Sequence, residues 1–319
     1  MTAAAWPRPA LSGRILHVDR GTGALDDLGA TDLPALFGPG DLLVVNDAAT
    51  LPASIVGTVG EAVVEVRFTG PIDEGQAVLF GAGSWRDDTD VRPPPPALRK
   101  GDVIAVDGGA LVVADVDRAH PRLVRLEVPA GIVWSAGRPI QYRYLARDVG
   151  LDEVQTPYAS RPWAAEMPSA GRPLTARVIA AIRDRGGRVM SITHAAGLSA
   201  TGDPALDALL PFPERTEVPQ ETWDAVTEAE RVVAVGTSVV RALESAARGV
   251  RSGPTTLRIG PDTPLLAVDA LLTNVHAPGE PHWQLLRAVA SEALLRRAHR
   301  CAVARGYLAH EFGDHFLIT

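Results

Sequence analysis

The chain has 319 residues, of which 46% are hydrophobic and 22% charged, a composition typical of a globular protein long enough for two domains. Its net charge of −7 argues against a surface built for bulk nucleic-acid binding, and no apolar run is long enough to span a bilayer. The amino terminus lacks a secretory signal pattern, Cys301 is the only cysteine, and no Cys/His cluster has metal-ligand spacing. We therefore expect a cytoplasmic protein with no metal, no membrane contact and a monomeric state.

The first third of the chain changes character near residue 58. Residues 41–47, "DLLVVND", predict a short buried strand that ends in polar residues. From 58 to 145, β-branched and partly alternating runs follow one another between Gly, Asp and Pro turns, with no helical period. This pattern predicts an inserted all-β domain, a barrel or a sandwich.

Beyond residue 150, helical and strand patterns alternate. Helices are expected at 174–186, 220–230, 237–249 and from Pro281 to about Arg305, and strands at 188–193, 231–236, near 255–259 and at 267–273. Such a succession predicts an α/β fold with a mixed, largely parallel sheet. We expect one discontinuous α/β catalytic domain, 1–57 and 146–319, interrupted by the barrel-like domain at 58–145.

Polar residues follow four of these predicted strands at the point where each ends. They are Asn46-Asp47, His194, Gly236-Thr237, and the group Thr273, Asn274 and His276. A single polar residue after a strand is usually a turn former or a helix cap. If the four strands are parallel, however, their carboxyl ends meet at one edge of the sheet, where ligands bind in α/β proteins. The four groups together predict one pocket.

The residue types indicate what that pocket could do. Thr237 is expected to cap a helix whose free N–H groups favour an anion such as a carboxylate, and the P-loop residues are missing. Arg241 and Glu244 are three apart and share a helix face. His194 and His276 are candidate acid/base groups because imidazole titrates near neutrality. From the residues alone, a small-molecule transferase or lyase is indicated.

Several segments, in order, resemble one family, the S-adenosylmethionine:tRNA ribosyltransferase-isomerases of queuosine biosynthesis. The segments are "DLLVVNDAATLPASIVG", "SAGRPIQYRYL", "VQTPYAS", "VVAVGTSVVRALES", "VDALLTNVHAPGE" and "FGDHFLI". They cover nearly the whole chain, which is more specific than any one motif. The family's architecture, an α/β domain interrupted by a β-barrel, agrees with the pattern read from the residues.

The resemblance implies transfer and isomerisation of the ribosyl part of S-adenosylmethionine onto the aminomethyl group of a 7-deazaguanine in tRNA, giving epoxyqueuosine. It implies no cofactor beyond S-adenosylmethionine as co-substrate. The sulfonium acidifies the C5′ protons, so His194 or His276 would act as base or hold the adenine. Asp47, also a catalytic candidate, and Asp314 would bind ribose hydroxyls or the substrate amine. Tyr158 and Asn274 would orient the adenine.

The chain departs from the family pattern near the expected chemistry. Arg172-Pro173 replaces a Leu-His pair, Phe212 stands where a paired histidine is expected and Glu214 is kept, and an arginine after Asn46-Asp47 is missing. Two alternatives therefore stay open. One is a paralogue that uses S-adenosylmethionine with a small deazapurine or another acceptor. The other is a non-catalytic nucleoside-binding protein.

Two locally basic stretches are candidate tRNA contacts within a chain that is acidic as a whole. Residues 161–188 contain six arginines against Glu166 and Asp184, and residues 287–305 contain five against Glu292. Solvated helix faces would have the same composition. On the helix predicted at 174–186, Arg177 and Arg185 are eight residues apart and are expected to share one exposed stripe.

Overall fold

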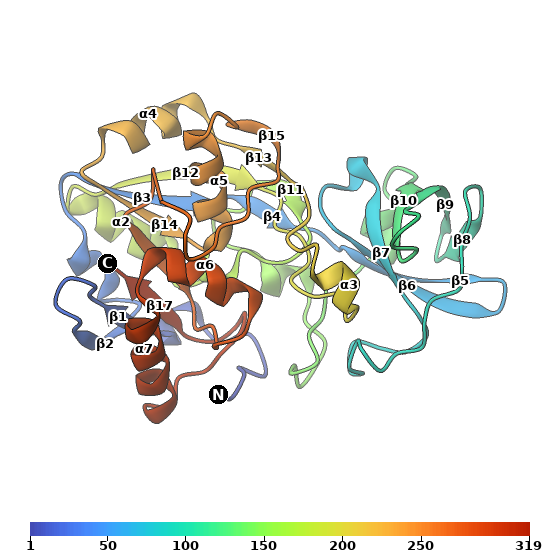
Figure 1. The fold of residues 1–319 in the computed structure, drawn as a ribbon, viewed down its shortest axis with the longest axis horizontal. Coiled ribbons are helices and arrows are strands. Elements are labelled where there is room, and N and C mark those ends of the chain that lie inside the picture. Colours follow the sequence, from blue (N-terminus) through green and yellow to red (C-terminus); the bar gives the residue numbers. More distant parts are fainter.

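The computed structural model describes residues 1–319 and has two parts, a helix-covered sheet and a smaller barrel (Figure 1). The sheet has nine strands in the order β15-β13-β12-β3-β14-β16-β17-β1-β2. Their bounds are β1 Arg14–Val18, β2 Leu25–Gly29, β3 Asp41–Asn46, β12 Arg188–His194, β13 Glu214–Glu217, β14 Arg231–Val235, β15 Ser252–Thr255, β16 Ala270–Asn274 and β17 His315–Ile318.

The centre of this sheet is parallel. Strands β12, β3, β14 and β16 are neighbours and all pair in parallel. On one side β13 and β15 continue the sheet in antiparallel pairings, and on the other β17 is antiparallel to β16. The predicted α/β fold with a mixed sheet is confirmed, and the four strands that end in polar residues are its four central, parallel strands.

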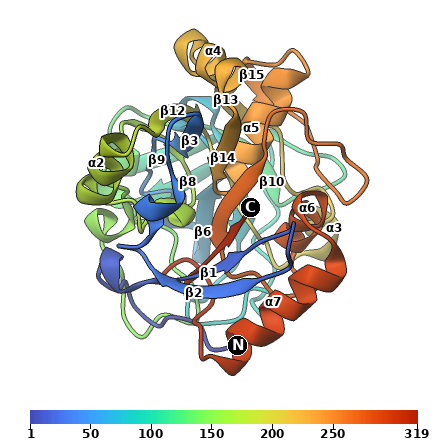
Figure 2. The ribbon, with the colours of Figure 1, turned by 90° about the vertical axis from the view of Figure 1, so that its left-hand side faces the viewer.

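Helices cover both faces of the sheet, as Figure 2 shows. Alternate residues of the central strands supply the two cores: Leu42 and Val44 of β3 pack on the side of four helices, and Leu43 and Val45 face the fifth. Burial on both faces explains why these strands read as continuous apolar runs. The four helices are α4 Gln220–Glu228, α5 Thr237–Ala247, α6 Pro281–Val289 and α7 Glu292–Ala304; the fifth is α2 Ala176–Asp184.

Two predicted elements differ in the structure. The single helix expected from Pro281 to about Arg305 is two helices, because Ala290 is extended (φ −145°, ψ 158°) and Ser291 caps α7 by accepting a hydrogen bond from the Leu294 amide. The apolar period continues across this break, so periodicity alone does not reveal it. The strand expected near 255–259 is β15, which ends at Thr255.

The barrel is closed and antiparallel, in the order β10-β7-β6-β5-β8-β9. Leu198, Leu206 and Phe212, which follow β12 in the chain, pack into the barrel's core cluster and so join it to the sheet. The limits predicted for the inserted domain, 58–145, remain a prediction. The barrel strands are β5 Ser54–Val59, β6 Ala62–Phe68, β7 Gln76–Phe80, β8 Val103–Val106, β9 Gly109–Val116 and β10 Leu123–Glu127.

Short elements connect the two parts. Strands β4 and β11 form a small parallel pair between the sheet and the barrel. None of the helices is long and apolar enough to cross a membrane. The remaining bounds are β4 Ala48–Thr50, β11 Arg161–Ala164, α1 Ile132–Ala136, α3 Pro204–Asp207 and the 3-10 helices η1 Ala10–Ser12, η2 Leu33–Leu36, η3 Ile72–Glu74, η4 Leu151–Val154 and η5 Ser169–Gly171.

A buried charge network ties the barrel together. The Glu65 carboxylate accepts hydrogen bonds from Ser54 Oγ at 2.7 Å, Arg67 Nε at 2.8 Å and Arg92 Nη1 at 2.5 Å. The Arg67 and Arg92 guanidinium groups lie near the Phe80 ring, 4.3 and 5.5 Å from its centroid. Burial by itself would raise the pKa of Glu65, but Arg67, then Arg92 and Ser54, lower that pKa to about 2.

We expect Glu65→Gln to lower the free energy of unfolding by about 3–5 kcal/mol at pH 7, because two buried guanidinium groups lose their counter-charge. Since the folded pKa is depressed, this stabilisation is complete above the ordinary glutamate pKa of 4.5 and is lost as the pH falls towards about 2. Denaturant unfolding at pH 7 and pH 3 checks both points. Glu61→Gln, on the exposed β5–β6 turn, is the control. An equal effect of the two substitutions at pH 7 would contradict the prediction.

Candidate functional site

A cavity of about 620 Å³ opens beyond the carboxyl ends of three of the four central strands, β12, β14 and β16. Its volume lies in the range of small-molecule sites. Six residues predicted from the sequence line it together: Gly236, Thr237, Arg241, Thr273, Asn274 and His276. Five of the six follow or end β14 and β16, and Arg241 lies on α5, so two of the four predicted polar strand ends share this cavity. The chemical roles of all six stay predictions.

The turn from β14 into α5 forms one wall. Gly236 has φ +90°, a backbone conformation that favours glycine, and it occupies the N-cap position. Thr237 is thus the first helical residue rather than the cap expected from the sequence, and no side chain caps this helix. Uncapped N–H groups at a helix amino terminus, reinforced by the helix dipole, favour an anionic group.

His276 lies on a second wall, held from both sides. Its Nδ1 is 3.3 Å from Glu280 Oε2 and its Nε2 is 3.2 Å from Thr273 Oγ1. Because a carboxylate only accepts, we assign the proton to Nδ1, which leaves Nε2 as the basic nitrogen. Burial would raise the pKa of Glu280, but hydrogen bonds from His276 and the Ala277 amide lower it. The ring stacks on His282 at 4.6 Å, and burial, then His276, lower the pKa of His282 to about 3.

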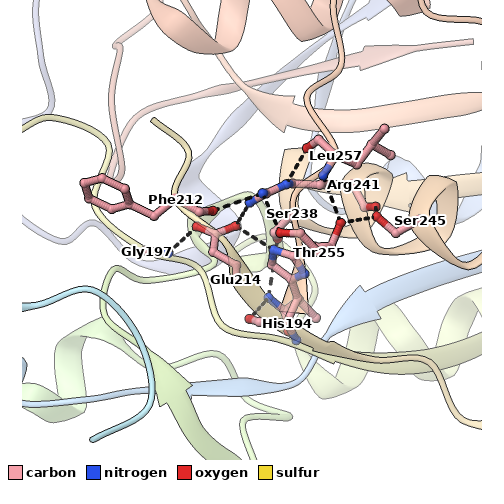
Figure 3. Close-up of polar contacts among 10 residues, drawn as sticks. His194, Gly197, Phe212, Glu214, Ser238, Arg241, Ser245, Thr255 and Leu257 are labelled. Carbon is pink, nitrogen blue, oxygen red and sulfur yellow. Dashed lines mark hydrogen bonds and ion pairs between the residues drawn. The ribbon is translucent and has the colours of Figure 1, made fainter. Parts of the chain in front are cut away.

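His194 does not line the cavity and is completely buried; Figure 3 shows its contact with Glu214. Its Nε2 donates to Glu214 Oε2 at 2.8 Å, whereas its Nδ1 has no partner. Glu214, which does line the cavity, also accepts hydrogen bonds from Arg241 and, at 2.8 Å, from the Gly197 amide. Burial would raise the pKa of Glu214, but His194 and Arg241 lower it. His194 thus reaches the cavity only through Glu214.

Arg241 is the centre of the same network. Beyond Glu214 it donates to three carbonyl oxygens, those of Leu257 at 2.7 Å, Thr255 at 2.9 Å and Phe212 at 3.0 Å. Figure 3 shows the guanidinium between these groups. Arg241 and Glu244, which were expected to share a helix face, form no ion pair with each other. Instead, Glu244 accepts from the Leu266 and Ala267 amides and pairs with Arg248.

The structure does not bring the other predicted site residues into the cavity lining. Asn46 is buried beneath it and bonds the backbone of His194 through both atoms of its amide, at 2.9 Å each. Asp47 accepts from Thr193 Oγ1 at 2.6 Å and Ser160 Oγ at 3.0 Å. Asp314 pairs with Arg8 and accepts from the Arg14 and Leu308 amides. Tyr158 packs against Gly171, where a Cβ would clash with its hydroxyl.

Besides Glu214, six further ionisable residues line the cavity that the sequence did not single out as site residues: Glu166, Arg258, Glu280, His282, His310 and Glu311. The i, i+4 spacing of His276 and Glu280 at a helix start was a usable signal for one of them. His282 lies in the first turn of α6, and the others lie on loops. His310 has φ +66°, a backbone conformation that no sequence motif predicts. No group of three or more His, Cys, Asp or Glu side chains is arranged to hold a metal ion.

The chain is similar to known proteins over nearly its full length. The family described as queuosine biosynthesis protein matches residues 2–318. An S-adenosylmethionine:tRNA ribosyltransferase-isomerase of Acidiphilium cryptum is 34% identical over 98% of this chain and 93% of that protein. One of the same name from Rubrobacter xylanophilus is 35% identical over 97% and 91%.

The fold also matches a solved structure, that of the S-adenosylmethionine tRNA ribosyltransferase from Thermotoga maritima. The TM-score is 0.54, over 99% of this chain and 96% of the other, at 23% sequence identity. This match supports the architecture of a sheet joined to a barrel. From the family match and the two relatives together, the chain belongs to the queuosine biosynthesis protein family.

Proposed function

We propose that this protein is an S-adenosylmethionine:tRNA ribosyltransferase-isomerase, which moves and isomerises the ribosyl part of S-adenosylmethionine onto a 7-aminomethyl-7-deazaguanine in tRNA. The observation that carries the proposal is the cavity at the carboxyl ends of the parallel strands, with His276 and the amino terminus of α5 facing it, in a chain that matches the family from residue 2 to 318. We further propose that it acts in the cytoplasm as a monomer.

His276 is the proposed general base. The sulfonium of S-adenosylmethionine acidifies the C5′ protons, and a neutral imidazole accepts one of them on Nε2, leaving an electron pair on C5′ next to the sulfur. Glu280 keeps the proton on Nδ1 and stabilises the imidazolium that forms, as a carboxylate partner does for a catalytic histidine. His194 is the weaker candidate because its basic nitrogen does not face the cavity.

The amino terminus of α5 is the proposed binding site for the methionine carboxylate. Its N–H groups lack a side-chain cap, and Gly236 lets the chain pass close to a ligand without a side chain in the way. Arg241 is not the partner in this proposal, because its donors already serve Glu214 and three carbonyl groups. Its role is to fix the wall.

Adenine release is the decisive measurement for the function. We expect the protein to release adenine from S-adenosylmethionine only when tRNA carrying 7-aminomethyl-7-deazaguanine is present, because the acceptor amine completes the transfer. Release with the free base but not with tRNA would assign a small-molecule acceptor. No release under any condition would contradict an enzymatic role altogether.

We expect His276→Gln to reduce the rate of adenine release by about 10²–10⁴-fold, because the C5′ proton loses its acceptor. Binding of S-adenosylmethionine, measured by calorimetry, is expected to change little, since the base acts mainly in the transition state. His120→Gln, in the barrel connection after β9, is the control. Unchanged turnover in His276→Gln would exclude it as the base.

We expect charge reversal at Arg177 and Arg185 to weaken tRNA binding while leaving S-adenosylmethionine binding intact. Both side chains are exposed on or next to α2. Each lost phosphate contact should lower the slope of log affinity against log salt by roughly one unit. Filter binding of tRNA over a salt series measures this slope, with Arg125→Glu on the barrel as the control. A slope identical to that of the wild type would remove these arginines from the tRNA surface.

A further inference from the structure

The four carboxylates that line the cavity fall into two kinds. Glu214 is paired with Arg241 and His194, and Glu280 with His276. Glu166 and Glu311 form no ion pair: Glu166 accepts from the Ser199 amide at 3.1 Å and hydroxyl at 3.2 Å, and Glu311 accepts from the Tyr144 hydroxyl. Glu166 and Glu311 thus face the cavity without an ion pair or hydrogen bond to an arginine or histidine of the protein.

A small pocket joins these two carboxylates. It has a volume of about 10 Å³, and Glu166, Met167 and Glu311 line both it and the large cavity. The rest of its lining is mostly apolar, including Pro139, Ile140 and Phe312. This is about the space of one water molecule. An ammonium head, –NH₃⁺, is similar in size to water, whereas a guanidinium or a trimethylammonium group is much larger.

The local electrostatics favour binding of a cation by these two groups. Burial raises the pKa of Glu166 to about 6 and that of Glu311 to about 7, and nothing nearby compensates fully. A cation placed between them would remove the cost of ionising both groups. Three N–H donors of an ammonium also match the acceptor oxygens that Ser199 and Tyr144 leave free.

We propose that Glu166 and Glu311 are specificity-determining residues that bind the primary ammonium group of a substrate in the pocket between them. The inference rests on the proposed function and deepens it, because both proposed substrates carry such a group. One is the α-ammonium of S-adenosylmethionine, and the other is the aminomethyl group of the acceptor base. The common chemistry is a primary alkylammonium.

Calorimetric binding to Glu166→Gln, Glu311→Gln and the double variant tests the proposal with two matched pairs of probes. The first pair is S-adenosylmethionine and its deaminated analogue, in which hydrogen replaces the α-ammonium while the sulfonium and the carboxylate stay. The second pair is 7-aminomethyl-7-deazaguanine and its neutral 7-methyl analogue. We expect the double variant to bind the ammonium-bearing member of one pair about tenfold or more weakly, because a hydrogen bond to a charged group is lost, and to bind its neutral counterpart unchanged.

The pair that responds identifies the source of the ammonium. Unchanged binding of both ammonium probes, equal weakening of a neutral probe and its charged partner, or a wild type that binds neither ammonium probe would overturn the proposal. Glu221→Gln, exposed on α4, controls for loss of negative charge, and thermal melts of all variants check folding. Failure of the proposed function is separate: a wild type that binds an ammonium probe through these residues but releases no adenine would retain the subsite and lose the reaction.

Discussion

One carboxylate, Glu214, fixes the geometry of the cavity. It begins β13, accepts the hydrogen bond of His194 at the end of β12, pairs with Arg241 on α5 and receives the Gly197 amide. A buried charge is tolerated only when it is paired and hydrogen-bonded, and removing one partner of such a pair costs about 3–5 kcal/mol. Three segments of the chain, at 194–197, 214 and 241, must therefore keep their positions for this anion to remain satisfied.

Arg241, the partner of Glu214, fixes further segments around the cavity. Its guanidinium holds the carbonyl groups of Phe212, Thr255 and Leu257, so the segments before β13 and after β15 are tied to α5 by charge-assisted bonds rather than by packing alone. Leu257 also lines the cavity. The wall next to the amino terminus of α5 is thus rigid, which suits a site that must hold a ligand in one orientation.

How far the sequence predicts this site depends on where each residue lies. Thr273, Asn274 and His276 were predictable because a strand buried on both faces admits polar groups only where it ends. Glu244 and Asp314 were also predicted as site residues, but their carboxylates accept hydrogen bonds from backbone amides instead. The donors are residues 266 and 267 for Glu244, and residues 14 and 308 for Asp314. Such contacts depend on how distant parts of the chain fold together, which local sequence patterns do not show.

Loop residues set the limit of prediction. Glu166 and Glu311 meet in the cavity although 145 positions separate them in the sequence, and neither follows a strand of the central sheet. The break between α6 and α7 could not be predicted from the sequence for a different reason. Both helices are amphipathic with the same period, so the apolar pattern does not show where one ends and the next begins. The fold class and the location of the cavity follow from local patterns; the pairing of its loops does not.

The two kinds of carboxylate suit different parts of the proposed reaction. The sulfonium loses its positive charge when methionine leaves as a neutral thioether, so anions placed against the sulfur would stabilise the ground state more than the transition state and slow the step. The ammonium at the far end of methionine keeps its charge throughout the reaction, so binding it does not raise the activation barrier. Carboxylates without a protein cation, such as Glu166 and Glu311, therefore suit a position away from the sulfur. There they would contact either a substrate group whose charge stays constant or an amine that must lose a proton. Glu214, whose charge Arg241 balances, and Glu280, whose charge becomes balanced when His276 takes up the C5′ proton, can lie beside the reacting atoms.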